Sequence, residues 1–339
     1  MGMPDTVNAV TGPLPAEMLG VTLMHEHVCI GAEGILLDSR FELDPAERFA
    51  EATRSLTAAR AAGIDTIVDA TPIDLNRDAA FLREVSEASG VNVVCSTGLY
   101  METHGVPAHF RQMSVDELSS LYVEEIERGI GRTNVRAGVI KVATSEHGVT
   151  DVNRKLLEAA AVAQAATGVP VISHTSGGHG VEQAATLTGA GAAPHQVMIG
   201  HVDHKYSSHA YFERILRTGV SIAFDRCGLG VFMPDAVRAA LFAGFVQLGL
   251  ESRVYLSMDS TSVHLGPRSP LEKDAEEPLV YLVTGFAELL ERFGVPRRTF
   301  DAVLTANPAR LFRGEPVGSD RPATVTGAPQ GDGRRLQPG

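Results

Sequence analysis

The chain has 339 residues, of which 44% are hydrophobic and 21% charged, the balance of a globular protein with a large core. Its formal net charge of −12 gives no electrostatic support for nucleic-acid binding. No run reaches the roughly 18 apolar residues of a membrane helix, and the N-terminus lacks the pattern of a secretory signal. The cysteines Cys29, Cys95 and Cys227 are too few and too widely spaced for a disulfide framework, so we expect a cytoplasmic protein.

Short runs rich in Val and Ile recur along the chain, each bounded by Gly, Pro or polar residues. This composition is typical of buried parallel strands. The predicted strands cover residues 21–27, 64–70, 91–98, 137–143, 169–174, 195–201, 219–225 and 253–259.

Helical segments are predicted between these strands. Residues 44–62 begin with an Asp-Pro start at Asp44. Ser114 and Glu117 form the pattern of a capping box, and Asp151 is the expected N-cap of the segment 151–168. The predicted helices are 44–62, 114–130, 151–168, 177–190, 207–217, 234–248 and 278–293.

Eight strands that alternate with helices predict an α/β fold, a (β/α)₈ TIM barrel, over residues 1–313. A doubly wound sheet is the alternative, but no glycine-rich phosphate fingerprint follows the first strand. Residues 314–339 are rich in Gly, Pro and Arg and lack apolar periodicity. We expect them to form a disordered tail.

Side chains that bind metals gather at the carboxyl ends of five predicted strands. They are His25 and His27 on the first strand, Lys141 on the fourth, His174 on the fifth, His201 on the sixth and Asp259 on the eighth. In a barrel these strand ends meet on one rim, where active sites lie. Because His25 and His27 are two residues apart they share a face of the strand, and Glu26 turns the other way.

Four histidines, an aspartate and a lysine exceed what a single tetrahedral zinc needs. Two divalent ions a few ångström apart would use the whole set. A lysine ammonium has no lone pair, so Lys141 can bridge two ions only after carboxylation of its Nζ. Each histidine taken singly is equally typical of a hydrogen-bonded core residue, but the complete set favours a metal centre.

Several motifs resemble the phosphotriesterase family of the amidohydrolase superfamily. They run from "GVTLMHEH" through "GVIKVATS", "VISHTS", "IGHVDH", "FDRCGL" and "LSMD" to "TANPARLF". The resemblance implies that His25, His27 and Asp259 bind the more buried of two ions. It also implies that His174 and His201 bind the more exposed ion and that Lys141, as N6-carboxylysine, bridges both with a hydroxide. The ions are expected to be Zn²⁺, with Co²⁺, Mn²⁺ or Fe²⁺ as substitutes, in a homodimer.

Two positions, Tyr100 and Arg226, resemble the phosphotriesterase-like lactonase branch of that family. Tyr100 stands where organophosphate specialists have a tryptophan, and this chain has no Trp. Arg226 replaces a histidine of their proton relay, and His204 replaces its aspartate, so organophosphates are expected to be poor substrates. As alternatives, Tyr100 is a packed aromatic and Arg226 pairs with Asp203 or Asp225.

The expected activity is hydrolysis of a lactone or carboxylic ester by a metal-bridging hydroxide, with weak promiscuous phosphotriesterase activity. Asp259 would move the proton to the leaving group, and Tyr100 would contact the substrate carbonyl, with Arg226 as a further catalytic residue. Two alternatives stay open: an amidohydrolase that cleaves an N-acyl amide, and a non-catalytic barrel that only binds its ligand. The complete ligand set argues against the second.

The loops after the last two predicted strands indicate which class of substrate the pocket would accept. The first, "CGLGVFMPD", is apolar, and the second offers only Arg268 to a phosphate. We therefore expect an acyl or aromatic group rather than a phosphate, and His264 is a possible substrate contact. The expected pocket walls are Phe224, Leu229, Val231, Phe232, Met233, Val263 and Leu265.

Overall fold

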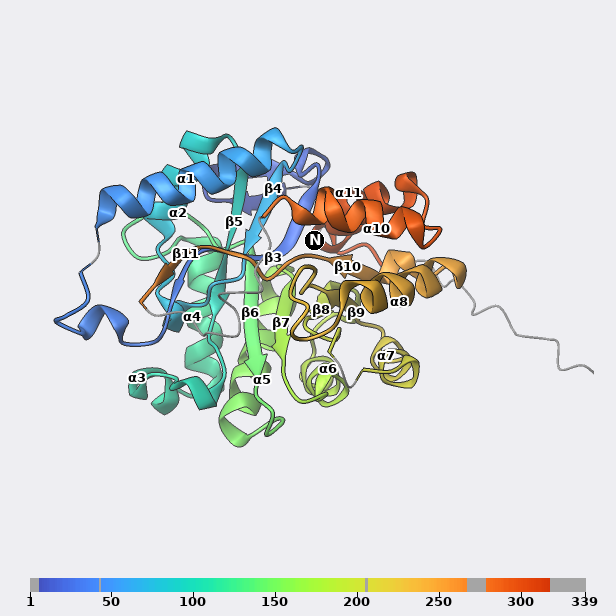
Figure 1. Cartoon of the computed structure of the whole chain (residues 1–339). Helices are drawn as coiled ribbons and strands as arrows, with labels where there is room; N and C mark the ends of the chain where they lie inside the picture. The colour runs from blue at the N-terminus through green and yellow to red at the C-terminus, as the bar shows by residue number, and fades with distance from the viewer. Residues whose placement is uncertain (1–5, 43, 205–206, 267–278, 318–339) are drawn as a thin grey trace, which may run out of the picture.

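A curled sheet of parallel strands forms the centre of the computed structural model, which describes residues 6–42, 44–204, 207–266 and 279–317 (Figure 1). The strand order is β10-β9-β8-β7-β6-β5-β4-β3-β11. These strands are β3 (Thr22–Gly31), β4 (Thr66–Asp69), β5 (Asn92–Gly98), β6 (Val139–Thr144), β7 (Val171–Thr175), β8 (Val197–Ile199), β9 (Ser221–Phe224), β10 (Val254–Leu256) and β11 (Thr261–Leu265). All of the predicted strands are present, as β3 to β10.

The two ends of this sheet meet and close a TIM barrel. The backbone N–H of Asp259, just after β10, donates to the carbonyl of His25 on β3 at 3.0 Å. The N–H of His27 donates to the carbonyl of Ser260 at 2.8 Å. Strand β11, which the sequence did not predict, then continues along the same edge of β3, opposite β4, in parallel register. The predicted (β/α)₈ fold is therefore confirmed.

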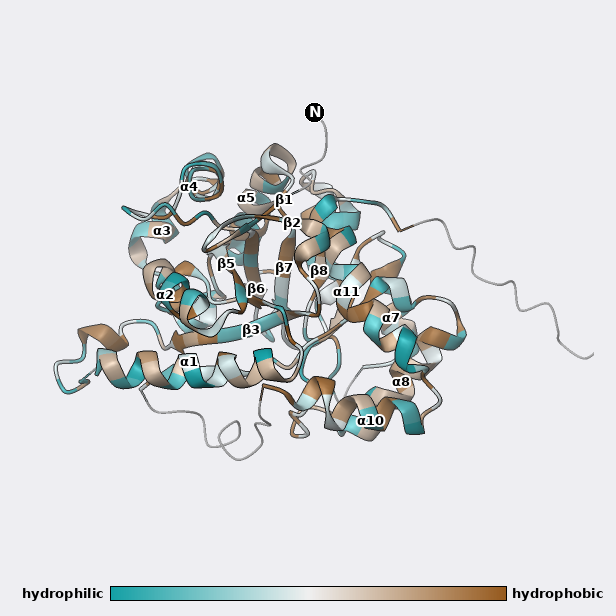
Figure 2. Ribbon diagram, turned by 90° about the horizontal axis from the view of Figure 1, so that it is seen from above, coloured by the Kyte–Doolittle hydropathy of each residue, from teal (hydrophilic) through white to brown (hydrophobic). Residues whose placement is uncertain are grey.

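Helices cover the outside of the sheet (Figures 1 and 2). The α-helices are α1 (Pro45–Ala61), α2 (Ala79–Ser89), α3 (Ala108–Gln112), α4 (Val115–Glu127), α5 (Asp151–Thr167), α6 (Gly180–Gly189), α7 (His209–Leu216), α8 (Asp235–Gln247), α10 (Gly285–Arg292) and α11 (Arg297–Arg313). Single 3₁₀ turns lie at Ala16–Met18, Ile35–Leu37, Ile73–Leu75, Glu102–His104, Pro194–Gln196, Glu251–Arg253 and Tyr281–Val283. Each predicted helical segment contains a helix, whereas α2, α3 and α11 were not predicted.

The helix starts follow their capping residues. The side chain of Asp44 caps α1, and Ser114 and Glu117 form the expected capping box of α4. The cap of α5 was predicted one residue too late. Thr150, not Asp151, is the N-cap, because its hydroxyl accepts a backbone N–H of the first turn while Asp151 is already helical.

Apolar side chains form two layers, one inside the barrel and one between the sheet and the helices. The inner layer consists of Met24, Val68, Val94, Val139, Ile172, Met198, Ala223 and Tyr255 from the strands, with Val7, Ala16, Leu19, Ala70, Leu311 and Phe312. Val7 belongs to a hairpin of β1 (Thr6–Ala9) and β2 (Gly12–Pro15). After β1, the N–H of Val10 donates to the carbonyl of Val93 near the start of β5. The hairpin therefore covers the amino end of the barrel.

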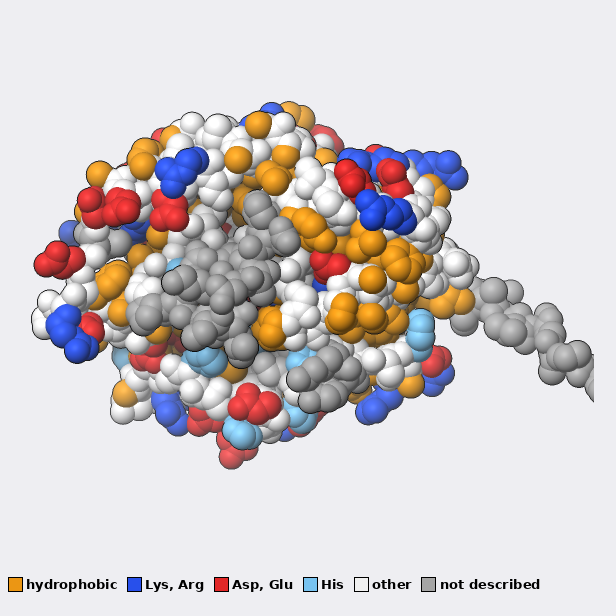
Figure 3. All heavy atoms as spheres, in the orientation of Figure 1, with side chains coloured by type: hydrophobic (Ala, Val, Ile, Leu, Met, Phe, Trp, Pro, Cys, Tyr) orange, Lys and Arg blue, Asp and Glu red, His pale blue; other side chains and the backbone are white. Residues whose placement is uncertain are grey.

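The outer surface is polar and mixed in charge. In Figure 2 strands β5 and β7 are mainly brown, β3 has a teal stretch, and teal residues lie along the helices around them. Figure 3 shows charged side chains of both signs scattered over one face, with hydrophobic side chains gathered over α8 and α10. Among the described residues, no helix is both long and apolar enough to cross a membrane. The predicted tail lies outside the described residues from position 318 onwards.

Candidate metal centre

The predicted metal ligands converge at the carboxyl end of the barrel. They are His25 and His27 on β3, Lys141 on β6, His174 on β7, His201 after β8 and Asp259 after β10. Lys141 Nζ lies 2.5 Å from His25 Nε2, and His27 Nε2 lies 3.3 Å from Asp259 Oδ1. His201 Nε2 lies 3.5 Å from Asp259 Oδ2. Side chains separated by more than two hundred positions thus form one cluster.

Within the cluster two overlapping neighbourhoods can be described, one around His25, His27 and Asp259 and one around His174 and His201. Ligand atoms of His25, His27 and Asp259 all lie within 4.8 Å of one another. His174 and His201 face each other edge to face, with ring centroids 4.2 Å apart. The two neighbourhoods are in contact, because His201 Nε2 lies 3.5 Å from Asp259 Oδ2 and the rings of His25 and His201 are stacked with centroids 4.7 Å apart. How the ligands divide between two ions therefore stays a prediction.

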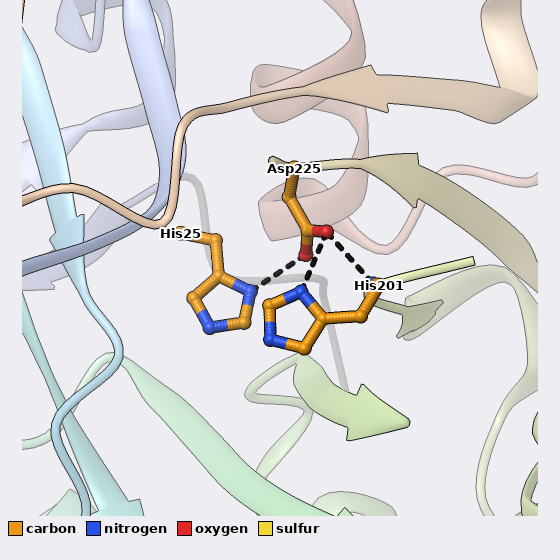
Figure 4. Close-up of side chains that lie close together, drawn as sticks. All are labelled: His25, His201 and Asp225. Atoms are coloured by element: carbon orange, nitrogen blue, oxygen red, sulfur yellow. Dashed lines mark hydrogen bonds and ion pairs between the residues drawn. The ribbon is translucent and has the colours of Figure 1, made fainter. Parts of the chain in front are cut away.

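Asp225, the first residue after β9, holds one histidine of each neighbourhood (Figure 4). Its Oδ2 lies 2.7 Å from His25 Nδ1, and its Oδ1 lies 2.8 Å from His201 Nδ1. Oδ1 also accepts the backbone N–H of His201 at 2.7 Å. Because a carboxylate only accepts, both Nδ1 atoms must carry protons, and each Nε2 presents its lone pair to the centre.

The two remaining histidines are oriented by hydroxyl groups. His27 Nδ1 lies 2.8 Å from Thr71 Oγ1. His174 lies between Tyr100 Oη, 3.0 Å from its Nδ1, and Ser176 Oγ, 3.0 Å from its Nε2. Every histidine of the cluster therefore has a partner that fixes its ring.

Two of the ligands have a left-handed backbone conformation. The φ angle is 57° at His201 and 55° at Asp259. Such angles are uncommon outside glycine, and they persist where surrounding bonds hold the chain. The N–H of His201 is held by Asp225, and that of Asp259 by the His25 carbonyl. The local backbone is thus fixed in a conformation that turns both side chains into the rim.

Burial alters the ionisation of the cluster. It lowers the pKa of Lys141 to about 8, and, with the charge of Lys141, it lowers the pKa of His25 to about 3. Burial also lowers the pKa of His174 well below its ordinary value. Burial opposes ionisation of Asp259, but the surrounding imidazoles and Arg226 outweigh it and hold the pKa of that carboxyl well below its usual range. Neutral imidazoles and an ionised carboxylate are the forms that bind metals.

The chemistry of this donor set fits a pair of divalent cations. His201 Nε2 is buried and has no hydrogen-bond partner among the described residues, although it faces Asp259. An orphaned buried acceptor of this kind is rare in a folded protein and indicates a missing partner. The lowered pKa of Lys141 raises the fraction of the uncharged amine, the form that reacts with carbon dioxide to give a carbamate.

A pocket of about 140 Å³ opens directly onto the cluster. It is lined by His27, Ile30, Tyr100, Lys141, His174, Arg226, Leu229, Asp259, Thr261 and His264. The hydroxyl of Tyr100 therefore stands beside the cluster and at the pocket, as a substrate contact requires. His264 also lines the pocket, in agreement with its expected position.

Arg226 pairs with neither of the aspartates considered from the sequence. Its Nε donates to Asp259 Oδ2 at 3.3 Å, and its guanidinium lies 3.9 Å from the ring centroid of Phe232. Only the backbone N–H of Arg226 reaches Asp203, at 3.3 Å. The side chain of Asp203 instead pairs with the buried Arg238. Arg226 is thus in direct contact with a predicted ligand.

The expected apolar walls are mostly absent from the pocket. Of the seven side chains, Leu229 alone belongs to the lining in the part of the chain that the structure describes. Phe224 packs in the outer layer against Phe212 and Phe245, because the last residue of β9 faces the helices. The ring centroids of His204 and Phe232 are 6.3 Å apart. Arg268 lies outside the described residues.

Two residues that organise the site were not recognised from the sequence. Asp225 appeared only as a possible partner of Arg226, although its position after a strand is the same signal that identified the ligands. Glu26 was predicted only to turn away from the histidines beside it. It does so, and its carboxylate binds the residues that surround Asp259.

Comparisons with known proteins agree with this geometry. Residues 5–312 match the model of the phosphotriesterase family. The chain is 31% identical over 300 residues to an aryldialkylphosphatase of Saccharolobus solfataricus, covering 87% of this chain and 95% of that one. A solved organophosphorus hydrolase of Deinococcus radiodurans is 40% identical with a TM-score of 0.86, covering 92% and 98% of the two chains. A variant of a PTE-like lactonase from the same organism is 38% identical with a TM-score of 0.85, covering 91% and 100%. The chain therefore belongs to the phosphotriesterase family, and it is a metal-dependent hydrolase that acts on ester bonds.

Proposed function

We propose that the chain hydrolyses lactones or carboxylic esters at a pair of divalent metal ions. The ligands would be His25, His27, Lys141, His174, His201 and Asp259. The observation that carries the proposal is their convergence at one end of the barrel, beside a pocket that His27, Lys141, His174 and Asp259 line. The buried Nε2 of His201, within the same cluster, lacks a hydrogen-bond partner among the described residues. A barrel that had lost its chemistry would be expected to have lost at least one of these ligands.

The donor set suits zinc, which binds imidazole and carboxylate ligands, with Co²⁺, Mn²⁺ or Fe²⁺ as substitutes. When bound, the two cations would supply a water activated near neutral pH and polarise the carbonyl of the ester. Lys141 would serve as N6-carboxylysine, because carboxylation turns a cationic side chain without a lone pair into an anion with two ligand oxygens. Its Nζ already lies 2.5 Å from His25 Nε2, inside the cluster.

The side chains around the pocket have distinct roles in this proposal. The hydroxyl of Tyr100 would donate a hydrogen bond to the substrate carbonyl and stabilise the charge that develops there. Asp259 would accept the proton of the attacking water and deliver it to the leaving alkoxide. Arg226 would keep Asp259 ionised and oriented through the contact from its Nε.

A lactone suits these side chains better than an organophosphate. Arg226 and His204 replace the histidine and the aspartate of the relay expected in organophosphate specialists, and an arginine does not exchange protons near neutral pH. Tyr100 occupies the position expected of a lactonase. The similarity to a PTE-like lactonase supports the same choice, and phosphotriester hydrolysis is expected to be weak.

A substrate panel tests this function. The metal-loaded protein would be assayed with γ- and δ-lactones, acyl-homoserine lactones, N-acyl amino acids and paraoxon. We expect kcat/KM for the best lactone to exceed that for paraoxon by at least about a hundredfold, which corresponds to about 2.8 kcal/mol of transition-state binding. Faster turnover of an N-acyl amide than of any lactone would identify an amidohydrolase instead.

We also propose that the protein is a cytoplasmic homodimer. The three cysteines are buried and free, which suits a reducing compartment. Light scattering coupled to gel filtration is expected to give twice the mass of 36.0 kDa. Elution at the mass of a single chain would contradict the dimer.

A further inference from the structure

Glu26 lies between two predicted ligands, yet its side chain takes no part in the pocket. It is 1% exposed, and its carboxylate accepts three hydrogen bonds from residues that follow β10. Oε1 accepts from the Ser257 hydroxyl at 2.8 Å and from the Met258 N–H at 2.9 Å, and Oε2 accepts from the Ser260 N–H at 2.7 Å. A buried carboxylate is retained where its hydrogen bonds compensate for the loss of water.

These three hydrogen bonds hold the chain on both sides of Asp259. Met258 and Ser260 are its two neighbours in the chain, so Glu26 holds the peptide on each side of it. Asp259 itself has a φ of 55°, a conformation that an aspartate keeps only where the surrounding structure enforces it. The Asp259 side chain is thereby turned toward His25, His27 and His201.

The same segment is tied to the first histidine by the backbone. The N–H of His25 donates to the Ser257 hydroxyl at 2.9 Å, while that hydroxyl donates to Glu26. Through this chain of bonds the segment 257–260 is fixed with respect to β3. Both oxygens of Glu26 are needed, because Oε1 accepts from Ser257 and Met258 while Oε2 accepts from Ser260. A carboxamide offers one acceptor oxygen and places an NH₂ group against the remaining donors.

We propose that Glu26 is a positioning residue that holds Asp259 in its ligating conformation and so determines how tightly the more buried metal ion binds. This inference rests on the proposed function, because it assigns Asp259 to a metal ion. Glu26 touches neither substrate nor metal and acts only through the backbone around Asp259.

The test is a titration of Co²⁺ into the metal-free protein, followed by the visible absorption of the bound ion and by elemental analysis. We expect Glu26→Gln to bind one of the two ions about 10- to 100-fold more weakly than the wild type, the usual effect of losing an orienting partner. The fully loaded variant is expected to show a lower kcat with little change in KM. Two ions bound with wild-type affinity by Glu26→Gln would overturn the inference.

Glu125→Gln is the matched control. Glu125 is also buried and accepts bonds from Arg77 and Thr97, which are neither predicted ligands nor their neighbours in the chain. We expect this variant to be less stable and to bind both ions normally. If it weakened metal binding as much as Glu26→Gln does, the effect would be general destabilisation and the inference would be wrong.

A second variant covers the case in which Glu26→Gln does not fold. Ser257→Ala removes one of the three donors. It is expected to weaken the binding of the same ion, by a smaller factor than Glu26→Gln does. An unchanged affinity in Ser257→Ala would then contradict the inference. Wild-type protein that itself fails to bind two ions would instead overturn the proposed function, and the inference with it.

Discussion

Asp225 is the residue that links the two halves of the candidate centre. One carboxylate holds the Nδ1 atoms of His25 and His201, which are assigned to different ions. The Cβ of any residue larger than glycine at position 200 would approach Asp225 Oδ2 to 2.6 Å and the Ser173 carbonyl oxygen to 2.1 Å. Gly200 is therefore required for the close approach of this carboxylate to the histidines.

Asp225→Asn is predicted to weaken metal binding. The carboxamide keeps one acceptor oxygen, so one histidine must face an NH₂ group. That imidazole would turn or adopt the tautomer in which Nε2 carries the proton, and a protonated nitrogen cannot bind a metal. Calorimetric titration with Zn²⁺ should show affinities reduced by about 10- to 100-fold. Unchanged affinities would show that Asp225 does not orient these ligands.

Tyr100→Phe is predicted to reduce turnover without loss of metal. The change removes the hydroxyl that lies 3.0 Å from His174 Nδ1 and at the pocket. Loss of a donor to a developing oxyanion typically lowers kcat by about a hundredfold. Steady-state kinetics on the best lactone, together with elemental analysis, would separate the two effects. Normal kcat in the variant would remove Tyr100 from the mechanism.

Among single residues, the clustering of the proposed ligands at one end of the barrel was predictable, whereas the residues that orient them were not. His25, His27, His174 and His201 stand out because histidines at the ends of apolar strands need an explanation. The roles of Asp225 and Glu26 depend on which strands become neighbours and how their side chains cross. No spacing within one strand contains that information.

Among the elements, the strands were the most predictable. Runs of Val and Ile bounded by Gly or Pro give β3 to β10 because both faces of each strand are buried. Strand β11 carries polar residues and follows β10 after a short turn, so its sequence resembles a loop. Helix α11 contains Pro308 in its interior, and proline is more typical of helix ends than of helix interiors.

Substitution inside the barrel tests the role of the strands in stability. Ile172 on β7 is fully buried in the inner layer. Ile172→Ala is predicted to lower the free energy of unfolding by about 2–5 kcal/mol, through lost burial and the cavity left behind. Val162→Ala on α5 is the control, because Val162 is 41% exposed and its loss should change stability by less than about 0.5 kcal/mol. If urea denaturation gave both variants the same loss in the free energy of unfolding, this account of the core would be wrong.

In the whole molecule, the side chains that stabilise the barrel and those proposed to carry out the chemistry lie in different places. The hairpin of β1 and β2 and the end of α11 contribute to the inner apolar layer. The polar cluster lies at the carboxyl ends, where loops of different sequence supply the pocket. This arrangement explains why the fold was predictable from repeating strands, whereas the pocket walls, which depend on loop conformation, were mostly predicted wrongly.

Metal removal is predicted to destabilise the whole barrel, because the ligands come from strands on different sides of it. A ligand present at a hundred times its dissociation constant adds about 2.7 kcal/mol to stability. Chelation should therefore lower the Tm by about 5 °C in a scanning calorimeter. Readdition of Zn²⁺ should restore it, and a Tm that is insensitive to chelation would argue against ions held between strands.

Six side chains of the barrel rim are proposed to hold two metal ions that hydrolysis requires. Elemental analysis of the purified protein, combined with the lactonase assay on the same sample, tests this proposal most directly. The account predicts about two divalent ions per chain, loss of turnover on chelation, and loss of most bound metal in Lys141→Ala. A metal-free preparation with full lactonase activity would contradict it.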